Sequence, residues 1–148
     1  MNVEGHIKSQ KAIPIGTKTL IHLQLVSNKV TDALGLALKP HDVSLQQFNV
    51  LRILRGQHGE PANLSTINER MVSKMSNTTR LVDKLLRKGY VRREVCQTNR
   101  RKVEIFITPQ GKEALLLMDK AIENAENILL AQCSIPDMQQ INRLLDKF

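Results

Sequence analysis

The chain has 148 residues and a formal net charge of +8, a length that favours one domain with a sizeable buried core. Aromatic residues are scarce, with three Phe, one Tyr and no Trp, which disfavours the stacking used by binders of single-stranded nucleic acid. No run of eighteen apolar residues and no apolar leader with a cleavage site is present, so we expect a cytoplasmic protein without a transmembrane span.

The first forty residues predict an irregular arm and one long helix. Residues 1–16 have mixed polarity and include Pro14 and Gly16, so they predict an irregular arm. In residues 17–39 apolar side chains recur at spacings of three and four, the pattern of an amphipathic helix. Pro40 should end this helix, because proline has no amide N–H and restricts the residue before it.

Two shorter helices should follow. Residues 45–55 are apolar nearly all round, which is typical of a buried helix, and either Asp42 or Ser44 is suited to cap its start. A third helix is predicted at about residues 64–72, after a connection rich in Gly and Pro. Three apolar side chains of this helix should face inward: Leu64, Ile67 and Met71.

Positive charge is concentrated in residues 70–102. This segment holds eleven Lys or Arg against Asp83 and Glu94, a net charge of +9, so the rest of the chain sums to about −1. A basic patch confined to one motif is expected of a surface that neutralises phosphates, since each bound cation releases a condensed counterion. The alternative is a solvated charged face with no ligand.

Residues 76–88 predict a short helix with two different faces. Its apolar face should hold four residues at spacings of three and four: Thr78, Leu81, Val82 and Leu85. Its polar face should hold four others: Asn77, Arg80, Lys84 and Arg87. Ser73 or Ser76 is suited to cap the start, and Gly89 suits the left-handed position beyond the end.

Two β-rich runs follow this helix, at residues 90–96 and 103–108, with alternating apolar side chains. The six residues between them, 97–102, form a polar and strongly basic hairpin tip. With the helix at 64–72 as the supporting helix and the helix at 76–88 as its basic partner, the order of elements predicts a winged helix-turn-helix.

The sequence of the C-terminal region predicts two helices with apolar faces. Thr108 should cap the first, with Pro109 at its first position, and apolar residues step by three and four to about Gln132. Ser134 or Pro136 opens the second helix, whose apolar positions are Met138, Ile141, Leu144, Leu145 and Phe148. These helices predict burial against a second copy of the chain; the alternative is a hairpin of the same helices within one chain.

The sequence also resembles a known family. The segments SNTTRLVDKLLRKGYVRRE (residues 76–94) and NRRKVEIFITPQGKE (residues 99–113) together resemble the MarR family of bacterial transcription regulators, with the likeness running over residues 17–148. The resemblance implies a mainly α fold with a small β-hairpin, in which a winged helix-turn-helix (44–108) is flanked by dimerisation helices (17–39 and 109–148). It also implies a two-fold dimer and a small-molecule effector bound between the dimerisation helices and the winged region.

One position departs from the family pattern. Where the family commonly carries an Asp ahead of the wing arginines, this chain has Asn99. An Asp at that position can hold a wing arginine through a charged pair, which an Asn cannot do.

The polar residues of the basic segment suggest distinct roles on duplex DNA. Asn77 is suited to adenine and Arg80 or Lys84 to guanine, and a two-fold dimer would read a pseudo-palindromic operator. Residues suited to backbone phosphates are Lys74, Ser76, Thr79 and Arg87. Residues of the hairpin tip suited to the minor groove or its edges are Arg100, Arg101 and Lys102.

Alternatives remain for the arginines. Arg80 is also placed to pair with Asp83 or Glu69 as a purely structural contact, and Arg92 and Arg93 are better suited to a strand surface than to base reading. A rival interpretation of the whole chain is a winged helix that contacts protein and has lost DNA binding.

No catalytic motif or Cys/His cluster is present, so we expect neither an enzyme nor a bound cofactor. The pair Cys96 and Cys133 has no metal-ligand spacing and should be free thiols, although Cys96 lies among cations that would favour a redox-active thiolate. Scattered histidines such as His22, His41 and His58 are more often ordinary side chains than metal ligands.

Overall fold

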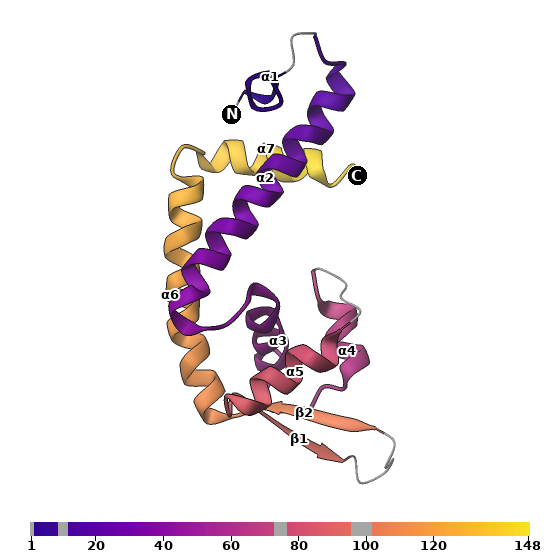
Figure 1. The fold of residues 1–148 in the computed structure, drawn as a ribbon, viewed down its shortest axis with the longest axis vertical. Helices are drawn as coiled ribbons and strands as arrows, with labels where there is room; N and C mark the ends of the chain where they lie inside the picture. Colours follow the sequence, from indigo (N-terminus) through magenta and orange to yellow (C-terminus); the bar gives the residue numbers. More distant parts are fainter. Residues whose placement is uncertain (1, 9–11, 73–76, 96–101) are drawn as a thin grey trace.

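The computed structural model describes residues 2–8, 12–72, 77–95 and 102–148 (Figure 1). In chain order the elements are α1 (Val3–His6), α2 (Ile15–Leu38), the 3-10 turn η1 (Lys39–His41), α3 (Leu45–Arg55), α4 (Leu64–Arg70), α5 (Thr78–Arg87), β1 (Val91–Val95), β2 (Val103–Ile107), α6 (Pro109–Leu130) and α7 (Ile135–Leu145). The mainly helical class with one β-hairpin, predicted from the sequence, is confirmed.

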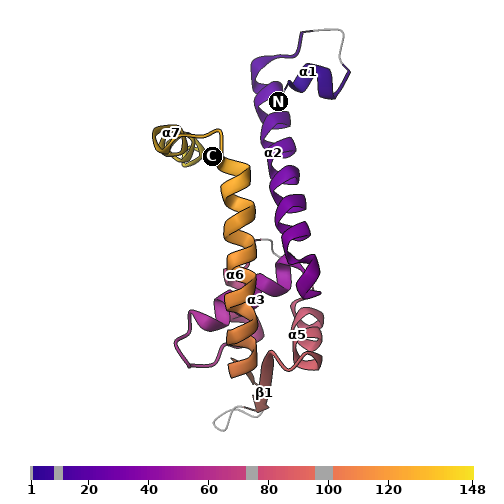
Figure 2. The same cartoon turned by 90° about the vertical axis from the view of Figure 1, so that its left-hand side faces the viewer.

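The molecule is elongated. Helices α2 and α6 contact each other and form a stem, with α3, α4, α5 and the hairpin at one end and α1 and α7 at the other (Figures 1 and 2). Arg55 of α3 makes an ion pair with Asp119 of α6, whose second contact joins Nη2 to Oδ1 at 3.4 Å. This pair and the apolar contacts of α3 with α2 and α6 fix the winged region to the stem.

Helices α2 and α3 form close to where the sequence predicts them. Helix α2 starts at Ile15, two residues before the predicted start, and ends at Leu38, after which Pro40 lies in the 3-10 turn. Helix α3 has the predicted bounds, and of its two candidate caps the structure uses Ser44. The Ser44 hydroxyl accepts from the Gln47 amide while the Gln47 side chain accepts from the Ser44 amide, a reciprocal capping box.

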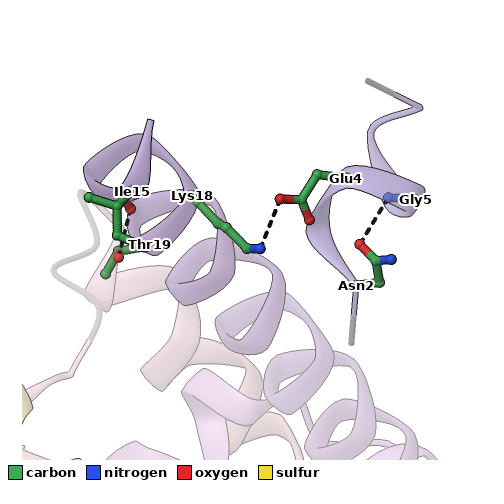
Figure 3. A network of polar contacts seen from close by, with 6 residues as sticks. All are labelled: Asn2, Glu4, Gly5, Ile15, Lys18 and Thr19. Atoms are coloured by element: carbon green, nitrogen blue, oxygen red, sulfur yellow. Dashed lines mark hydrogen bonds and ion pairs between the residues drawn. The ribbon is translucent and has the colours of Figure 1, made fainter. Parts of the chain in front are cut away.

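The expectation of an irregular N-terminal arm is wrong for residues 3–6, which form α1. Asn2 caps this single turn by accepting from the Gly5 amide at 3.2 Å, and Glu4 reaches Lys18 of α2 at 2.8 Å (Figure 3). Val3 is fully buried. A four-residue helix is unstable alone, so its contacts with α2, which sequence periodicity cannot reveal, account for it.

The two helices of the helix-turn-helix are shorter than predicted. Helix α4 ends at Arg70 because Met71 is extended (φ −68°, ψ 132°), although the Met71 side chain is buried as expected. Helix α5 has Asn77, not Ser73 or Ser76, at its N-cap position, and both serines lie outside the described residues. The Thr78 hydroxyl donates to Asn68 Oδ1 of α4 at 3.1 Å, which ties the start of α5 to the supporting helix.

One apolar core joins the winged region to α6. Its largest fully buried side chains come from α2 to α6 and the hairpin, and they include Leu38, Phe48, Leu51, Leu54, Ile67, Leu85, Ile105, Leu115 and Met118. The predicted inward face of α5 is confirmed, since Val82 and Leu85 are fully buried and Thr78 nearly so.

Strands β1 and β2 pair antiparallel, with Val91 opposite Ile107 and Val95 opposite Val103. Ala62, just before α4, adds a short bridge: its amide donates to Ile105 O at 3.0 Å and its carbonyl accepts from the Ile105 amide at 2.9 Å. The middle of β2 is therefore held by the connection that leads into the helix-turn-helix.

The end of α5 and the start of α6 meet at Thr108, which caps α6 as predicted. The Thr108 hydroxyl donates to Gly89 O at 2.6 Å and accepts from the Gly111 amide at 3.0 Å. Gly89 has the left-handed conformation (φ 71°) predicted for it. Gly111 packs so closely that an added Cβ would lie 2.1 Å from Tyr90 O. We call this contact of Gly89, Tyr90, Thr108 and Gly111 the Thr108 junction.

Helix α7 has no fully buried residue, and its opening capping box between Ser134 and Asp137 confirms Ser134 as the cap. Apolar side chains near the end of the chain are exposed by 43% to 82%: Ile141, Leu144, Leu145 and Phe148. In the part of the chain that the structure describes, no helix is long and apolar enough to cross a membrane.

The Thr108 junction predicts that Gly111→Ala destabilises the protein by about 2 kcal/mol or more, because the new methyl group would overlap a backbone carbonyl that cannot move freely. Gly35→Ala in α2 is the matched control: its Cβ meets nothing within 4 Å, so it should stabilise by about 0.5–1 kcal/mol. Urea unfolding at one fixed protein concentration measures both. A Gly111→Ala variant with the same free energy of unfolding as the wild type would contradict the rigidity of this junction.

Candidate nucleic-acid interface

The exposed face of α5 carries the predicted cations. Arg80, Lys84 and Arg87 are all exposed, and they follow one another at spacings of four and three, with Asn77 and Thr79 exposed at the start of the helix. The opposite face of the helix packs into the core through Val82 and Leu85, which are fully buried. Packing therefore fixes which side of α5 reaches solvent, and that side is cationic.

These cations are available for a ligand. Within the described ranges Arg80, Lys84 and Arg87 form no ion pair. The two structural partners considered for Arg80 are engaged elsewhere: Asp83 accepts from Arg93 at 2.8 Å, and Glu69 accepts from Ser65 at 3.0 Å. An anion that approaches α5 would therefore displace water rather than an internal carboxylate.

The arginines of β1, by contrast, are held by neighbours. The Arg92 guanidinium lies 3.9 Å from the centre of the Phe106 ring and also contacts Glu94, and Arg93 pairs with Asp83 of α5. Their placement agrees with their interpretation as strand-surface charges. The Arg93–Asp83 pair also ties the hairpin to α5.

Only part of the hairpin tip can be placed. Lys102 is exposed immediately before β2. The other residues assigned to DNA at the tip or ahead of α5 lie outside the described residues: Lys74, Ser76, Arg100 and Arg101. Cys96 and Asn99 lie outside them too, so their predicted roles stay predictions.

The structure adds a contact at the far end of α5 that the sequence did not indicate. Lys88 Nζ lies 2.5 Å from Asp42 Oδ2, and this hydrogen bond, with the charge of Lys88, lowers the pKa of the Asp42 carboxyl. Asp42 has a left-handed backbone (φ 50°) in the turn between η1 and α3. The two residues are 46 positions apart, so no local pattern could have paired them.

No metal centre is visible where the chain is described: no three His, Cys, Asp or Glu side chains gather in those ranges. Cys133 is a half-buried free thiol. The chemistry that the described surface offers is cationic and hydrogen-bonding, the kind that neutralises phosphate and contacts base edges.

The chain is similar to a known protein family and to two transcriptional regulators. The model of the MarR family matches residues 43–103. YfiV, a helix-turn-helix-type transcriptional regulator of Bacillus subtilis strain 168, is 38% identical over 72 residues, which are 49% of this chain and 44% of YfiV. The helix-turn-helix-type regulator PecS of Dickeya dadantii strain 3937 is 30% identical over 111 residues, 72% of this chain and 66% of PecS. The chain thus spans about half to two thirds of these relatives.

Solved structures share the fold over nearly the whole chain. A MarR-like regulator from Bacillus cereus superposes with a TM-score of 0.80 at 22% identity, covering 90% of this chain and 96% of that one. Apo MarR from Escherichia coli gives 0.72 at 24% identity, covering 93% and 98%. A variant of Escherichia coli MarR in complex with operator DNA gives 0.77 at 22% identity, covering 99% and 98%. The predicted winged helix-turn-helix fold is confirmed.

Proposed function

The chain belongs to the MarR family of transcriptional regulators, and from this premise we propose that it binds double-stranded DNA sequence-specifically, as a homodimer, to repress transcription. The observation that carries the proposal is the face of α5: Arg80, Lys84 and Arg87 are exposed, and they have no ion-pair partner within the described ranges. A row of cations without internal partners on a fixed helix is suited to the phosphate-lined major groove.

On this proposal α5 lies in the major groove. Asn77, at the N-cap, makes no side-chain capping bond and pairs with adenine, while Arg80 or Lys84 pairs with guanine. Thr79 and Arg87 contact phosphates, as do Lys74 and Ser76 on the sequence prediction. Arg100, Arg101 and Lys102 reach the minor groove from the hairpin tip. The operator-bound Escherichia coli MarR variant, which has the same fold, supports this docking.

A homodimer would explain the exposed apolar surface at the far end of the stem. Ile141, Leu144 and Phe148 near the end of the chain are each about half exposed or more, and so is Leu20 of α2. Apolar patches of this kind on soluble proteins mark association sites. We assign α2, α6 and α7 to dimerisation and residues 44–108 to DNA binding, with two α5 helices about one helical turn (roughly 34–36 Å) apart.

An effector site is also part of the proposal. A hollow of about 390 Å³ lies between α2, α3 and α6, the size of a small-molecule site, and Leu34, Phe48 and Ile122 supply apolar contacts in it. Arg52, whose guanidinium lies 5.7 Å from the centre of the Phe48 ring, supplies a charge. A ligand there would change DNA binding only by favouring one spacing of the two α5 helices over another.

Binding to a random-sequence duplex should depend steeply on salt. If each subunit places three cations on phosphates, the dimer makes six contacts and affinity should fall about 10³-fold between 50 and 200 mM salt. Fluorescence anisotropy measures this slope. Arg87→Ala, which removes a phosphate contact, should flatten it, whereas Lys120→Ala on the exposed surface of α6 should not. Salt-independent or absent binding would favour the protein-contact interpretation.

Asn77→Ala should relax base preference at one position per half-site. A bidentate adenine contact is worth about 1–3 kcal/mol, so discrimination there should fall by about 5- to 150-fold while folding stability is unchanged. Selection of bound fragments from a random DNA pool, for wild type and variant, reads out this preference. Asn124→Ala, on exposed α6, is the control. An equal loss of affinity over all DNA sequences would instead mean that Asn77 contacts the DNA backbone.

Disruption of the proposed dimer interface should give monomers. Sedimentation of the wild-type protein at micromolar concentration should show twice the 16.8 kDa chain mass. Leu144→Asp should shift it toward the monomer, because a carboxylate in an apolar interface is costly to desolvate. Asn142→Asp adds the same charge to α7 at a position that is already polar, and should remain dimeric. A monomeric wild-type chain would refute the assignment.

A further inference from the structure

A second cationic feature lies beside the exposed face of α5. A hollow of about 340 Å³ opens where the C-terminal half of α5 meets the turn into α3, and we call it the α3–α5 hollow. It is lined by three cations and two further polar residues: Lys84, Arg87, Lys88, Asp42 and Gln47. Cations outnumber carboxylates three to one, so the hollow favours an anion.

Gln47 supplies an oriented donor at the wall of this hollow. Its side chain is almost buried, with 4% of the residue exposed, and its Oε1 accepts from the Ser44 amide at 2.9 Å. Because an amide N–H must meet an oxygen, this bond fixes which end of the Gln47 amide is Nε2. Nε2 donates to no residue among those described, and no described side-chain nitrogen or oxygen is both fully buried and unpaired, so Nε2 reaches the hollow.

The α3 helix reinforces this site. Its N-terminus, where Ser44 and Gln47 lie, carries the positive end of the helix dipole and favours an anion nearby. Lys88 already pairs with one anion, the Asp42 carboxylate at 2.5 Å, but an ammonium group has three N–H donors and two remain. The Asp42 side chain also lines the hollow, and it is 92% exposed.

We propose that the α3–α5 hollow holds one backbone phosphate of duplex DNA, through Gln47 Nε2, Lys84, Arg87 and Lys88. This inference depends on the proposed DNA binding and extends it to α3. The two non-bridging oxygens of a phosphodiester can each accept more than one hydrogen bond, which matches a neutral amide donor beside several cations. A phosphate held by α3 and α5 together would set how deep α5 sits in the groove.

The capping box provides a clean test, Gln47→Glu. Glutamate keeps the oxygen that accepts from the Ser44 amide, since Ser-x-x-Glu is itself a capping box, but it replaces the Nε2 donor by a negative charge. We expect the thermal midpoint to stay within a few degrees and duplex affinity at 100 mM salt to fall at least tenfold. Lys88→Gln, outside the core, should also lower affinity, by threefold or more.

Gln132→Glu is the matched control. It changes the net charge equally, but Gln132 is exposed in the turn between α6 and α7, outside the α3–α5 hollow and the proposed effector site. Its duplex affinity should fall less than threefold, by long-range repulsion alone. Equal losses in the Gln132 and Gln47 variants, or an unchanged affinity in Gln47→Glu, would overturn the phosphate contact.

Inorganic phosphate separates a backbone phosphate from a free anion. If millimolar phosphate raises the thermal midpoint of the wild type but not of Gln47→Glu, while both bind duplex equally, the hollow takes a free anion and the inference is wrong. A wild-type protein that binds no duplex at low salt would overturn the proposed function and this site together. If the wild type binds duplex at low salt and Gln47→Glu binds it with the same affinity, only the proposed phosphate site is overturned.

Discussion

The arrangement of this molecule depends on the Thr108 junction. One hydroxyl donates to the carbonyl of Gly89, two residues beyond the end of α5, and accepts from the amide of Gly111, in the first turn of α6. Gly89 takes a left-handed conformation, and Gly111 leaves room for the Tyr90 carbonyl, where a side chain would collide. The end of the basic helix, the root of the hairpin and the start of the stem are thereby fixed in one place.

Burial, rather than surface charge, decides the orientation of α5. Val82 and Leu85 are fully buried, which stabilises by about 1.5–3 kcal/mol each, whereas an exposed ion pair contributes at most about 1 kcal/mol. The helix therefore does not need its cations for folding. Arg93 and Lys88 form ion pairs with Asp83 and Asp42. The three cations of the outer face, Arg80, Lys84 and Arg87, form no ion pair within the described ranges.

The sequence was most informative where local chemistry sets structure. Helix α3 had the bounds expected from its apolar residues and Ser44, and the two faces of α5 followed from residue spacing alone. Helix α1 was missed because a single turn has no periodicity and exists through contacts with α2. The Lys88–Asp42 pair joins distant segments, so only the fold reveals it. Of the predicted DNA contacts, Asn77, Thr79, Arg80, Lys84, Arg87 and Lys102 are exposed, but exposure alone does not identify what each one touches.

Helix α6 gives the molecule a mechanical property. Its 22 residues span about 33 Å at 1.5 Å per residue, and Asp119, near the middle of the helix, is paired with Arg55 of α3. The C-terminal half of α6 extends about 16 Å beyond this ion pair, so a tilt of about 10° there displaces the tip by about 3 Å, close to the 3.4 Å rise of one base pair. The stem is thus a lever: a modest angular change at the Arg55–Asp119 contact becomes a step of nearly one nucleotide at the far end of α6.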